Sequence, residues 1–220
     1  MIRYLSHELS PHTPFYGLAE RGLVTVKIKA MAEGASCDVH RITIENHWGT
    51  HIDCPAHFFP GGKGPCDYDA EYWLFRFPQV IHISVEPGGV VRKTDLITPL
   101  RATTDLLILQ SGWGARRSSS MYSLQGPGLH PEIGTWLRKE YPCIRAVGFD
   151  WISLSSYAHR DVGREAHRAF LDPEGEGHPI LVIEDMLLED NLENLKHVWV
   201  VPLRVSGVDS APCTIIGVFE

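Results

Sequence analysis

No apolar stretch in this 220-residue sequence approaches the ~20 residues that a membrane-spanning helix requires. The first residues, Met1 to Glu8, also lack the apolar run of a secretory signal. Positive charge is scarce, because the formal net charge is −7 and the basic residues form no cluster beyond Arg116 and Arg117. We therefore predict a cytoplasmic protein that binds no membrane and does not have nucleic acid as its main partner.

Cysteine is scarce as well, and its five copies are widely spaced with no Cys-x-x-Cys pair. An odd number of isolated cysteines argues against a disulfide framework and for reduced thiols. A chain of this length can bury a sizeable core without cross-links, and no repeat or linker divides it. We predict a single domain over residues 1–220. The cysteines are Cys37, Cys54, Cys66, Cys143 and Cys213.

A dense group of metal-ligating residue types lies between positions 47 and 57. It contains His47, His51, Asp53 and His57, all at odd-numbered positions. Imidazole nitrogen with carboxylate oxygen is the ligand set of zinc, manganese and iron sites. A buried aspartate among histidines also needs compensating charge, which a cation would supply. The His-Glu-x-x-His pattern of helical zinc proteases is absent, and a strand with surface histidines is the alternative explanation.

The local sequence favours an extended conformation for this segment. Gly49 and Pro55 disfavour a helix, and Thr50 is β-branched. Since side chains alternate across a strand, His47, His51 and Asp53 would share one face, opposite to the even-numbered residues between them. Pro55 and the glycines that follow should bend the chain, which would leave the last histidine near the others but not in line with them.

The rest of the chain alternates predicted strands with a few helices. Short apolar or alternating runs that end in glycine- and proline-rich turns predict strands. Proline in the first turn and cations near the end predict the first helix. We expect an α/β fold with one mixed, β-rich sheet or barrel-like core and a few flanking helices. The predicted strands are 24–29, 39–44, 79–85, 105–110, 144–149, 180–183, 198–205 and 214–219, and the predicted helices are 131–140 and 162–171.

Two further ligand candidates lie in the second half of the chain. His167 is in the second predicted helix, and Glu184 directly follows the apolar run Ile180 to Ile183. Each has an alternative explanation: His167 could lie on a solvated helix face, and Glu184 could be the N-terminal charge of a following helix. Asp150 and Ser153 follow another apolar strand, where they could orient a ligand histidine or cap the next loop or helix.

Together these motifs resemble the metal-dependent cyclase-like hydrolases, a family that includes bacterial kynurenine formamidase and isatin hydrolase. The family signature is His-x-Gly-Thr-His-x-Asp-x-Pro-x-His, and residues 47–57 match it at every specified position. Gly148 to Ser153 is similar to the family's Gly-x-Asp-x-x-Ser, and Val201 to Leu203 with Asp209 to Pro212 resembles its C-terminal segment. The resemblance implies a fold of the swivelling β/β/α type and a homo-oligomer, either a dimer or a larger assembly.

The resemblance also implies roles for the candidate residues. One or two divalent metal ions would be bound, with zinc as the first expectation and manganese as the alternative. His57 would be the catalytic acid/base, a weaker metal ligand or supporting group being its alternative role, and Phe58 would contact the substrate. The implied ligands are His47, His51 and Asp53 for one ion and Asp53, His167 and Glu184 for the other.

The implied activity is hydrolysis of a carbon–nitrogen bond in a small amide, and N-formylkynurenine, which would yield kynurenine and formate, is the best single substrate. Hydrolysis of a cyclic amide or a lactone is the second hypothesis, and a metal-binding module without turnover is the third. The chain departs from the formamidases near its N-terminus, where His12 to Leu18 replaces their proline-glycine-acid turn. The formamidase assignment is therefore weaker than the hydrolase assignment.

Overall fold

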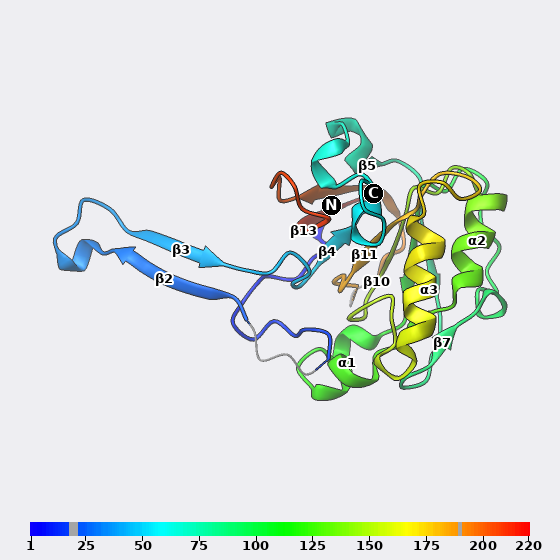
Figure 1. The fold of residues 1–220 in the computed structure, drawn as a ribbon, viewed down its shortest axis with the longest axis horizontal. Coiled ribbons are helices and arrows are strands. Elements are labelled where there is room, and N and C mark those ends of the chain that lie inside the picture. Colours follow the sequence, from blue (N-terminus) through cyan, green and yellow to red (C-terminus); the bar gives the residue numbers. More distant parts are fainter. Residues whose placement is uncertain (18–21, 189–190) are drawn as a thin grey trace.

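A computed structural model describes residues 1–17, 22–188 and 191–220 of the chain (Figure 1). Within these ranges the core is one nine-stranded sheet whose strand order is β5-β12-β13-β4-β11-β10-β8-β6, with β1 paired to β13. The edge strand β6 also approaches β12, so the sheet curls back toward its own far side. The strands are β1 (Ile2–Tyr4), β4 (His51–Asp53), β5 (Leu74–Phe75), β6 (Pro78–His82), β8 (Leu106–Gln110), β10 (Ala146–Phe149), β11 (Leu181–Glu184), β12 (Leu195–Pro202) and β13 (Ser210–Phe219).

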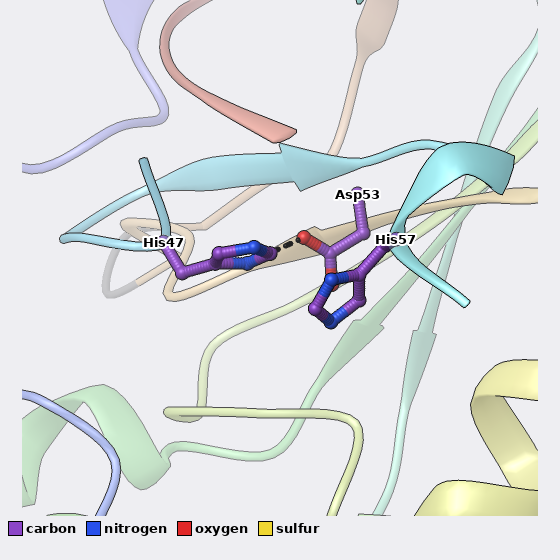
Figure 2. A group of neighbouring side chains, drawn as sticks. All are labelled: His47, Asp53 and His57. Carbon is purple, nitrogen blue, oxygen red and sulfur yellow. Dashed lines mark ion pairs between the residues drawn. The ribbon is translucent and has the colours of Figure 1, made fainter. Parts of the chain in front are cut away.

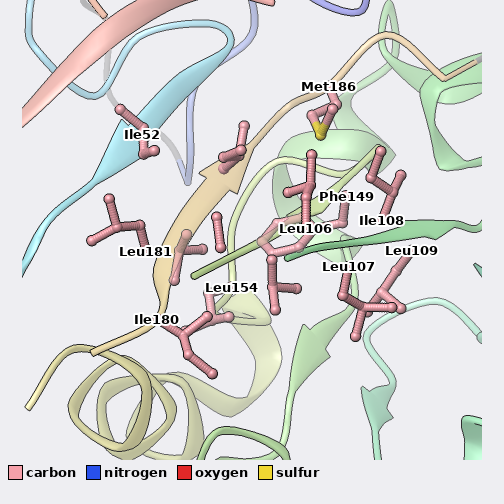
Figure 3. Packing of buried hydrophobic residues seen from close by; sticks show 14 of the residues in the cluster. Ile52, Leu106, Leu107, Ile108, Leu109, Phe149, Leu154, Ile180, Leu181 and Met186 are labelled. Atoms are coloured by element: carbon pink, nitrogen blue, oxygen red, sulfur yellow. The ribbon is translucent and has the colours of Figure 1, made fainter. Parts of the chain in front are cut away.

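The sheet has a parallel half and an antiparallel half. Strands β6, β8, β10 and β11 pair in parallel, and β4, β13, β12, β5 and β1 pair antiparallel. Leu106 to Leu109 are fully buried, as is usual for parallel strands that are covered on both faces (Figure 3). The predicted α/β fold with a mixed, β-rich sheet is therefore confirmed.

The helices α2 (Pro131–Glu140) and α3 (Arg160–Leu171) pack against each other beside this sheet. Helix α2 has the predicted bounds, because Pro131 occupies its first turn and His130 accepts a hydrogen bond from the backbone N–H of Glu132. Helix α3 begins two residues before the prediction. None of the described helices is long and apolar enough to span a membrane. The remaining helical segments are α1 (Ser120–Gln125) and the 3₁₀ turns Met31–Glu33, Pro55–His57, Pro65–Asp67, Ala70–Trp73, Lys93–Asp95, Trp113–Arg116 and Tyr157–His159.

Strands β2 (Val24–Lys29) and β3 (Val39–Thr43) form a hairpin that projects far from the rest of the chain (Figure 1). We call this hairpin the arm. Both strands were predicted, but the half-buried character expected from the alternation of β2 is wrong, since every residue of β2 is exposed. A two-stranded arm has no second layer to cover its apolar side chains. A smaller two-stranded sheet joins β7 (Val90–Val91) to β9 (Gly128–Leu129).

Several strand boundaries differ from the predictions. The last two predicted strands, 198–205 and 214–219, begin earlier, at Leu195 and Ser210. Lys196 and His197 interrupt the apolar sequence at the first start, and Pro212 interrupts it at the second, so neither start belongs to a continuous apolar run. Pairing with a neighbouring strand decides both starts instead. All five cysteines are free, as predicted, and Cys54 and Cys213 are buried.

Candidate metal centre

The motif lies on β4, the strand that joins the two halves of the sheet. Its extended conformation is limited to His51–Asp53, so the prediction of a strand from position 47 is wrong. His47 lies in a turn, and Gly49 adopts a left-handed φ of 64°, where a Cβ would collide with the Leu9 side chain. The turn nevertheless folds His47 back over the strand, so that its Nδ1 lies 3.0 Å from Asp53 Oδ1 (Figure 2).

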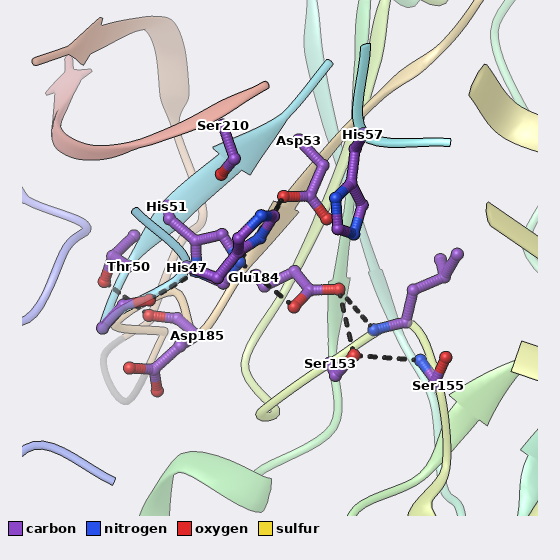
Figure 4. A network of polar contacts seen from close by, with 12 residues as sticks. His47, Thr50, His51, Asp53, His57, Ser153, Ser155, Glu184, Asp185 and Ser210 are labelled. Carbon is purple, nitrogen blue, oxygen red and sulfur yellow. Dashed lines mark hydrogen bonds and ion pairs between the residues drawn. The ribbon is translucent and has the colours of Figure 1, made fainter. Parts of the chain in front are cut away.

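The two candidates from the second half of the chain reach the same place. Glu184 ends β11 directly opposite His51, and His51 Nε2 lies 3.3 Å from Glu184 Oε2 (Figure 4). His167 is 5% exposed, so the solvated-face explanation for it is wrong. Its Nε2 lies 3.7 Å from Asp53 Oδ2 and 3.7 Å from Glu184 Oε1. The five predicted ligand side chains therefore lie together, four of them buried and His47 partly exposed.

The ring nitrogens that face away from this point are already fixed. His51 Nδ1 donates to the backbone oxygen of Gly49 at 2.8 Å, and His167 Nδ1 donates to the backbone oxygen of Gly163 at 2.8 Å. A hydrogen bond of this kind leaves Nε2 as the lone-pair nitrogen of a neutral imidazole, which is the form that binds a metal. Both rings therefore present a ligand nitrogen to Asp53 and Glu184.

The donor set fits a divalent cation. His51 Nε2 and Asp53 Oδ1 are buried and have no hydrogen-bond partner, although unpartnered buried polar atoms are costly. In the described part of the chain, two groups bring their ligand atoms within 4.8 Å of one another, and Asp53 belongs to both. The groups are His51, Asp53 and Glu184, and His47, Asp53 and His57. Nitrogen and carboxylate oxygen donors in this number suit zinc or manganese.

Charge in the cluster is balanced between the histidines and the carboxylates. Burial disfavours the charged form of His51, yet the adjacent carboxylates of Glu184 and Asp53 raise its pKa to about 9. Burial acts the same way on His167, and the nearby carboxylates of Asp53 and Glu184 raise its pKa to about 10. Burial and the nearby Asp53 oppose ionisation of Glu184, but the two histidines lower its pKa to about 2. A cation entering the site therefore meets ionised carboxylates and displaces protons from the histidines.

His57 stands at the edge of this cluster. It ends the 3₁₀ turn Pro55–His57, which bends the chain away from β4 as Pro55 predicted. Its Nδ1 donates to Asp209 Oδ2 at 2.7 Å, and its ring centroid is 4.2 Å from that of His47. Asp209 received no role from the sequence. The only sequence signal was its place in the segment Asp209 to Pro212, which resembles the family's C-terminal segment.

Asp150 and Ser153 have different roles. Asp150 accepts hydrogen bonds from the Ser111 backbone and hydroxyl and from the Gly112 backbone, so it caps the loop after β8. Ser153 Oγ donates to Glu184 Oε1 at 3.3 Å, and the Leu154 backbone N–H donates to the same oxygen at 2.6 Å. Ser153 therefore orients a candidate ligand carboxylate, where the sequence suggested a ligand histidine.

The cluster opens into a cavity of about 250 Å³. Phe58 forms one wall and stacks on His167, with the ring centroids 4.7 Å apart and the planes 12° apart. Tyr16, from the N-terminal segment where the chain departs from the formamidases, forms part of another wall, and Leu18 of that segment lies outside the described residues. A larger cavity of about 700 Å³ is lined by Tyr68, Tyr72 and other residues, but the histidine and carboxylate cluster borders the smaller one.

Sequence comparison supports the resemblance. The chain is 27% identical over 183 residues to a kynurenine formamidase of Geobacillus thermodenitrificans, covering 82% of this chain and 80% of that protein. It is 24% identical over 225 residues to cyclase-like protein 2 of Oryza sativa subsp. japonica, covering 96% of this chain and 77% of that protein.

Solved structures share the fold. Isatin hydrolase A from Labrenzia aggregata, solved with benzyl benzoate bound, superposes with a TM-score of 0.77 at 21% identity, covering 100% of this chain and 94% of that one. A potential metal-dependent hydrolase with cyclase activity superposes with a TM-score of 0.76 at 18% identity, covering 99% of this chain and 96% of that one. The model of the Cyclase family matches residues 4–156, which include all of the first motif. This chain therefore belongs to the Cyclase family.

Proposed function

We propose that this protein is a metal-dependent hydrolase that cleaves a carbon–nitrogen bond of a small amide or formamide. One observation carries the proposal. Buried His51, Asp53, His167 and Glu184 converge from three separate elements, and two of their ligand atoms, His51 Nε2 and Asp53 Oδ1, make no hydrogen bond. His57, which is more exposed than these residues, borders the same cavity.

The side chains divide the chemistry between them. A divalent cation held by the cluster, zinc first and manganese as the alternative, would supply Lewis acidity that polarises a carbonyl and makes water nucleophilic near neutral pH. Since His57 Nδ1 donates to Asp209, its Nε2 remains to accept a proton from the attacking water. His57 then returns that proton to the leaving nitrogen as the carbon–nitrogen bond breaks, so that a formamide yields formate and an amine.

N-formylkynurenine is the first proposed substrate. The sequence relatives named kynurenine formamidase come from several bacteria, including Geobacillus thermodenitrificans and Bacillus cereus. Phe58 would contact the planar aryl group, because its ring already stacks on His167 at the cavity wall.

A neutral cyclic amide or lactone is the second candidate. The described residues that line the 250 Å³ cavity include neither lysine nor arginine, so they supply no strong partner for the carboxylate of an amino-acid substrate. Tyr16, Phe58 and Ile152 instead give it an aromatic and apolar wall. This lining favours a compact, uncharged ring.

We also propose that the chain assembles as a homo-oligomer through two uncovered apolar surfaces. On one face of the arm, Val24 and Val26 are 52% and 49% exposed. On the outer face of the antiparallel half-sheet, Tyr4, Ile216 and Trp199 are adjacent across β1, β13 and β12, and Tyr4 is 67% exposed. Apolar surfaces of this kind commonly pack against another chain.

The oligomer is tested by sedimentation equilibrium of the wild-type protein and of a Val24→Lys, Val26→Lys variant. We expect a dimer or larger assembly that dissociates in the variant, while Lys27→Ala on the same strand leaves the mass unchanged. A monomeric wild-type protein would contradict this part of the proposal.

The activity is tested by elemental analysis of freshly purified protein, followed by assays of N-formylkynurenine and isatin with added zinc or manganese. Formamide cleavage supports the first substrate, and isatin opening alone supports the second. His57→Ala should abolish turnover while bound metal remains. Metal without turnover on any amide or lactone would indicate a binding module, and failure to bind metal under any loading condition would overturn the mechanism.

A further inference from the structure

Asp209 joins the two histidines that stand at the mouth of the cavity. Its Oδ2 lies 3.0 Å from His47 Nε2 and 2.7 Å from His57 Nδ1 (Figure 4 shows both rings). Its other oxygen, Oδ1, accepts a hydrogen bond from Asn46 Nδ2 at 2.7 Å. One carboxylate oxygen is therefore directed at both imidazoles. The second oxygen is hydrogen-bonded to Asn46, which is not one of the candidate ligands.

The backbone fixes this carboxylate in place. Asp209 immediately precedes β13, and its carbonyl oxygen accepts a hydrogen bond from the Cys54 backbone N–H at 3.1 Å. The next residue, Ser210, pairs directly with Asp53 in the β4–β13 register. Asp209 is consequently anchored to the same strand that carries the candidate ligands.

A carboxylate only accepts hydrogen bonds, and this determines which nitrogen of each ring carries the proton. A neutral His57 that donates from Nδ1 has its lone pair on Nε2. A neutral His47 that donates from Nε2 has its lone pair on Nδ1, the atom 3.0 Å from Asp53 Oδ1. The same oxygen thus selects the ligand nitrogen of one ring and the basic nitrogen of the other.

We propose that Asp209 is a positioning residue that sets the tautomers of His47 and His57 together. The effect of Asp209 on turnover rests on the proposed function, whereas its effect on the two tautomers does not. Asp209 links metal retention to the acid/base group, because loss of this one carboxylate would disturb both His47 and His57. Carboxylates that orient metal-ligating histidines are typically worth ~10- to 100-fold in metal affinity or activity.

The test compares three variants. Asp209→Ala removes the acceptor from both rings. In Asp209→Asn the amide oxygen can still accept from both rings if Asn46 turns its own amide, so the conservative variant should keep the wild-type tautomers. Asn46→Ala is the matched control, since it removes a hydrogen bond to the same carboxylate and leaves the oxygen that faces the histidines.

Two readouts do not depend on turnover. The first is the ¹⁵N chemical shift of labelled histidine, which distinguishes Nδ1–H from Nε2–H, measured with and without zinc. The second is the affinity for zinc alone. For Asp209→Ala we expect mixed tautomers at His57 in both states, mixed tautomers at His47 in the zinc-loaded state, and zinc affinity lower by ~10- to 100-fold. Where a substrate is cleaved, kcat should fall while KM changes little.

Wild-type tautomers and zinc affinity in Asp209→Ala would overturn the inference, and so would equal losses in Asn46→Ala. Thermal melts of each variant establish that the protein is folded. If the wild-type protein binds no zinc and cleaves nothing, the proposed function fails, and the His57 signal of the metal-free protein still decides the role of Asp209.

Discussion

His51 and Glu184 are direct neighbours across the antiparallel pair of β4 and β11, with 3.3 Å between His51 Nε2 and Glu184 Oε2. This single register position connects the histidine motif to the second half of the chain. Because side chains alternate along a strand, a slip of one residue would turn Glu184 away from the cluster. The proposed metal centre therefore depends on strand register as much as on residue identity.

Replacement of His51 by alanine should remove most of the bound metal, because His51 belongs to the group His51, Asp53 and Glu184 that could hold an ion. The measurement is metal content after loading with zinc and gel filtration. His82→Ala is the matched control, because His82 is exposed and lies at the end of β6. Equal metal content in both variants would exclude His51 as a ligand.

The metal-free protein should be most stable between about pH 4.5 and 6.5. The folded protein raises the pKa of His51 from 6.5 to about 9 and that of His167 to about 10, so their contribution is complete below pH 6.5 and is lost as pH rises through 9 to 10. It lowers the pKa of Glu184 from 4.5 to about 2, so that contribution is complete above pH 4.5 and is lost as pH falls toward 2.

Thermal melts in the presence of a chelator should show this maximum. Added zinc should remove the alkaline decline, because a metal-ligating imidazole is neutral. A metal-free melting temperature that rises between pH 6.5 and 9 would contradict the assignment of the protons to these histidines.

Arg117→Met should destabilise the protein by about 3–5 kcal/mol, because it would leave Asp185 as a buried charge without its cation. Asp185 is fully buried, has a left-handed φ of 53°, and accepts hydrogen bonds from Arg117 Nη2 at 2.7 Å and Tyr122 Oη at 2.5 Å. It also directly follows Glu184, so zinc affinity should fall as well. Urea unfolding and zinc titration measure the two effects.

The control is Arg116→Met, since the Arg116 side chain is exposed and lies over the Trp113 ring, a contact worth about 0.5–1 kcal/mol. If both variants lost the same stability, the ion pair with Asp185 would not be the cause.

Gly134→Ala should destabilise the packing of α2 on α3 by about 1–3 kcal/mol. A Cβ at this position would lie 2.8 Å from Phe170 Cδ2 and 3.0 Å from the backbone of Ala169. This overlap outweighs the ~1 kcal/mol that alanine normally gains over glycine inside a helix. The urea midpoint measures the effect, and the exposed Thr135→Ala in the same helix should be neutral or slightly stabilising.

The fold class and the part of the cluster on β4 were predictable from sequence because they depend on local patterns. Leu106 to Leu109 form an uninterrupted apolar run, and Pro131 marks the start of a helix. The two-residue spacing of His51 and Asp53 places both on one face of β4. His167 and Glu184 required the resemblance, since neither has a local signal that separates a ligand from a surface residue.

The parts that sequence missed depend on contacts between distant segments. His47 reaches Asp53 through a turn at Gly49 that packs against Leu9. The alternation of side chains along a strand does not predict such a turn. Asp209 meets His57 across 152 positions of chain. The apolar residues of the arm, such as Val26, fit the pattern of a half-buried strand. That pattern does not distinguish cover by the same chain from cover by another chain.

The position of β4 between β11 and β13 has a consequence for synthesis of the protein. Both neighbours come from the last part of the chain, so the ribosome releases the histidine motif long before either strand that fixes it has been made. The final strand, β13, borders β4 and is preceded by Asp209, so the centre closes only when that strand has docked. A nascent chain that lacks β11 and β13 would carry the motif in full and still have no assembled site, so retention of the proposed metal would be a sign that both strands have docked.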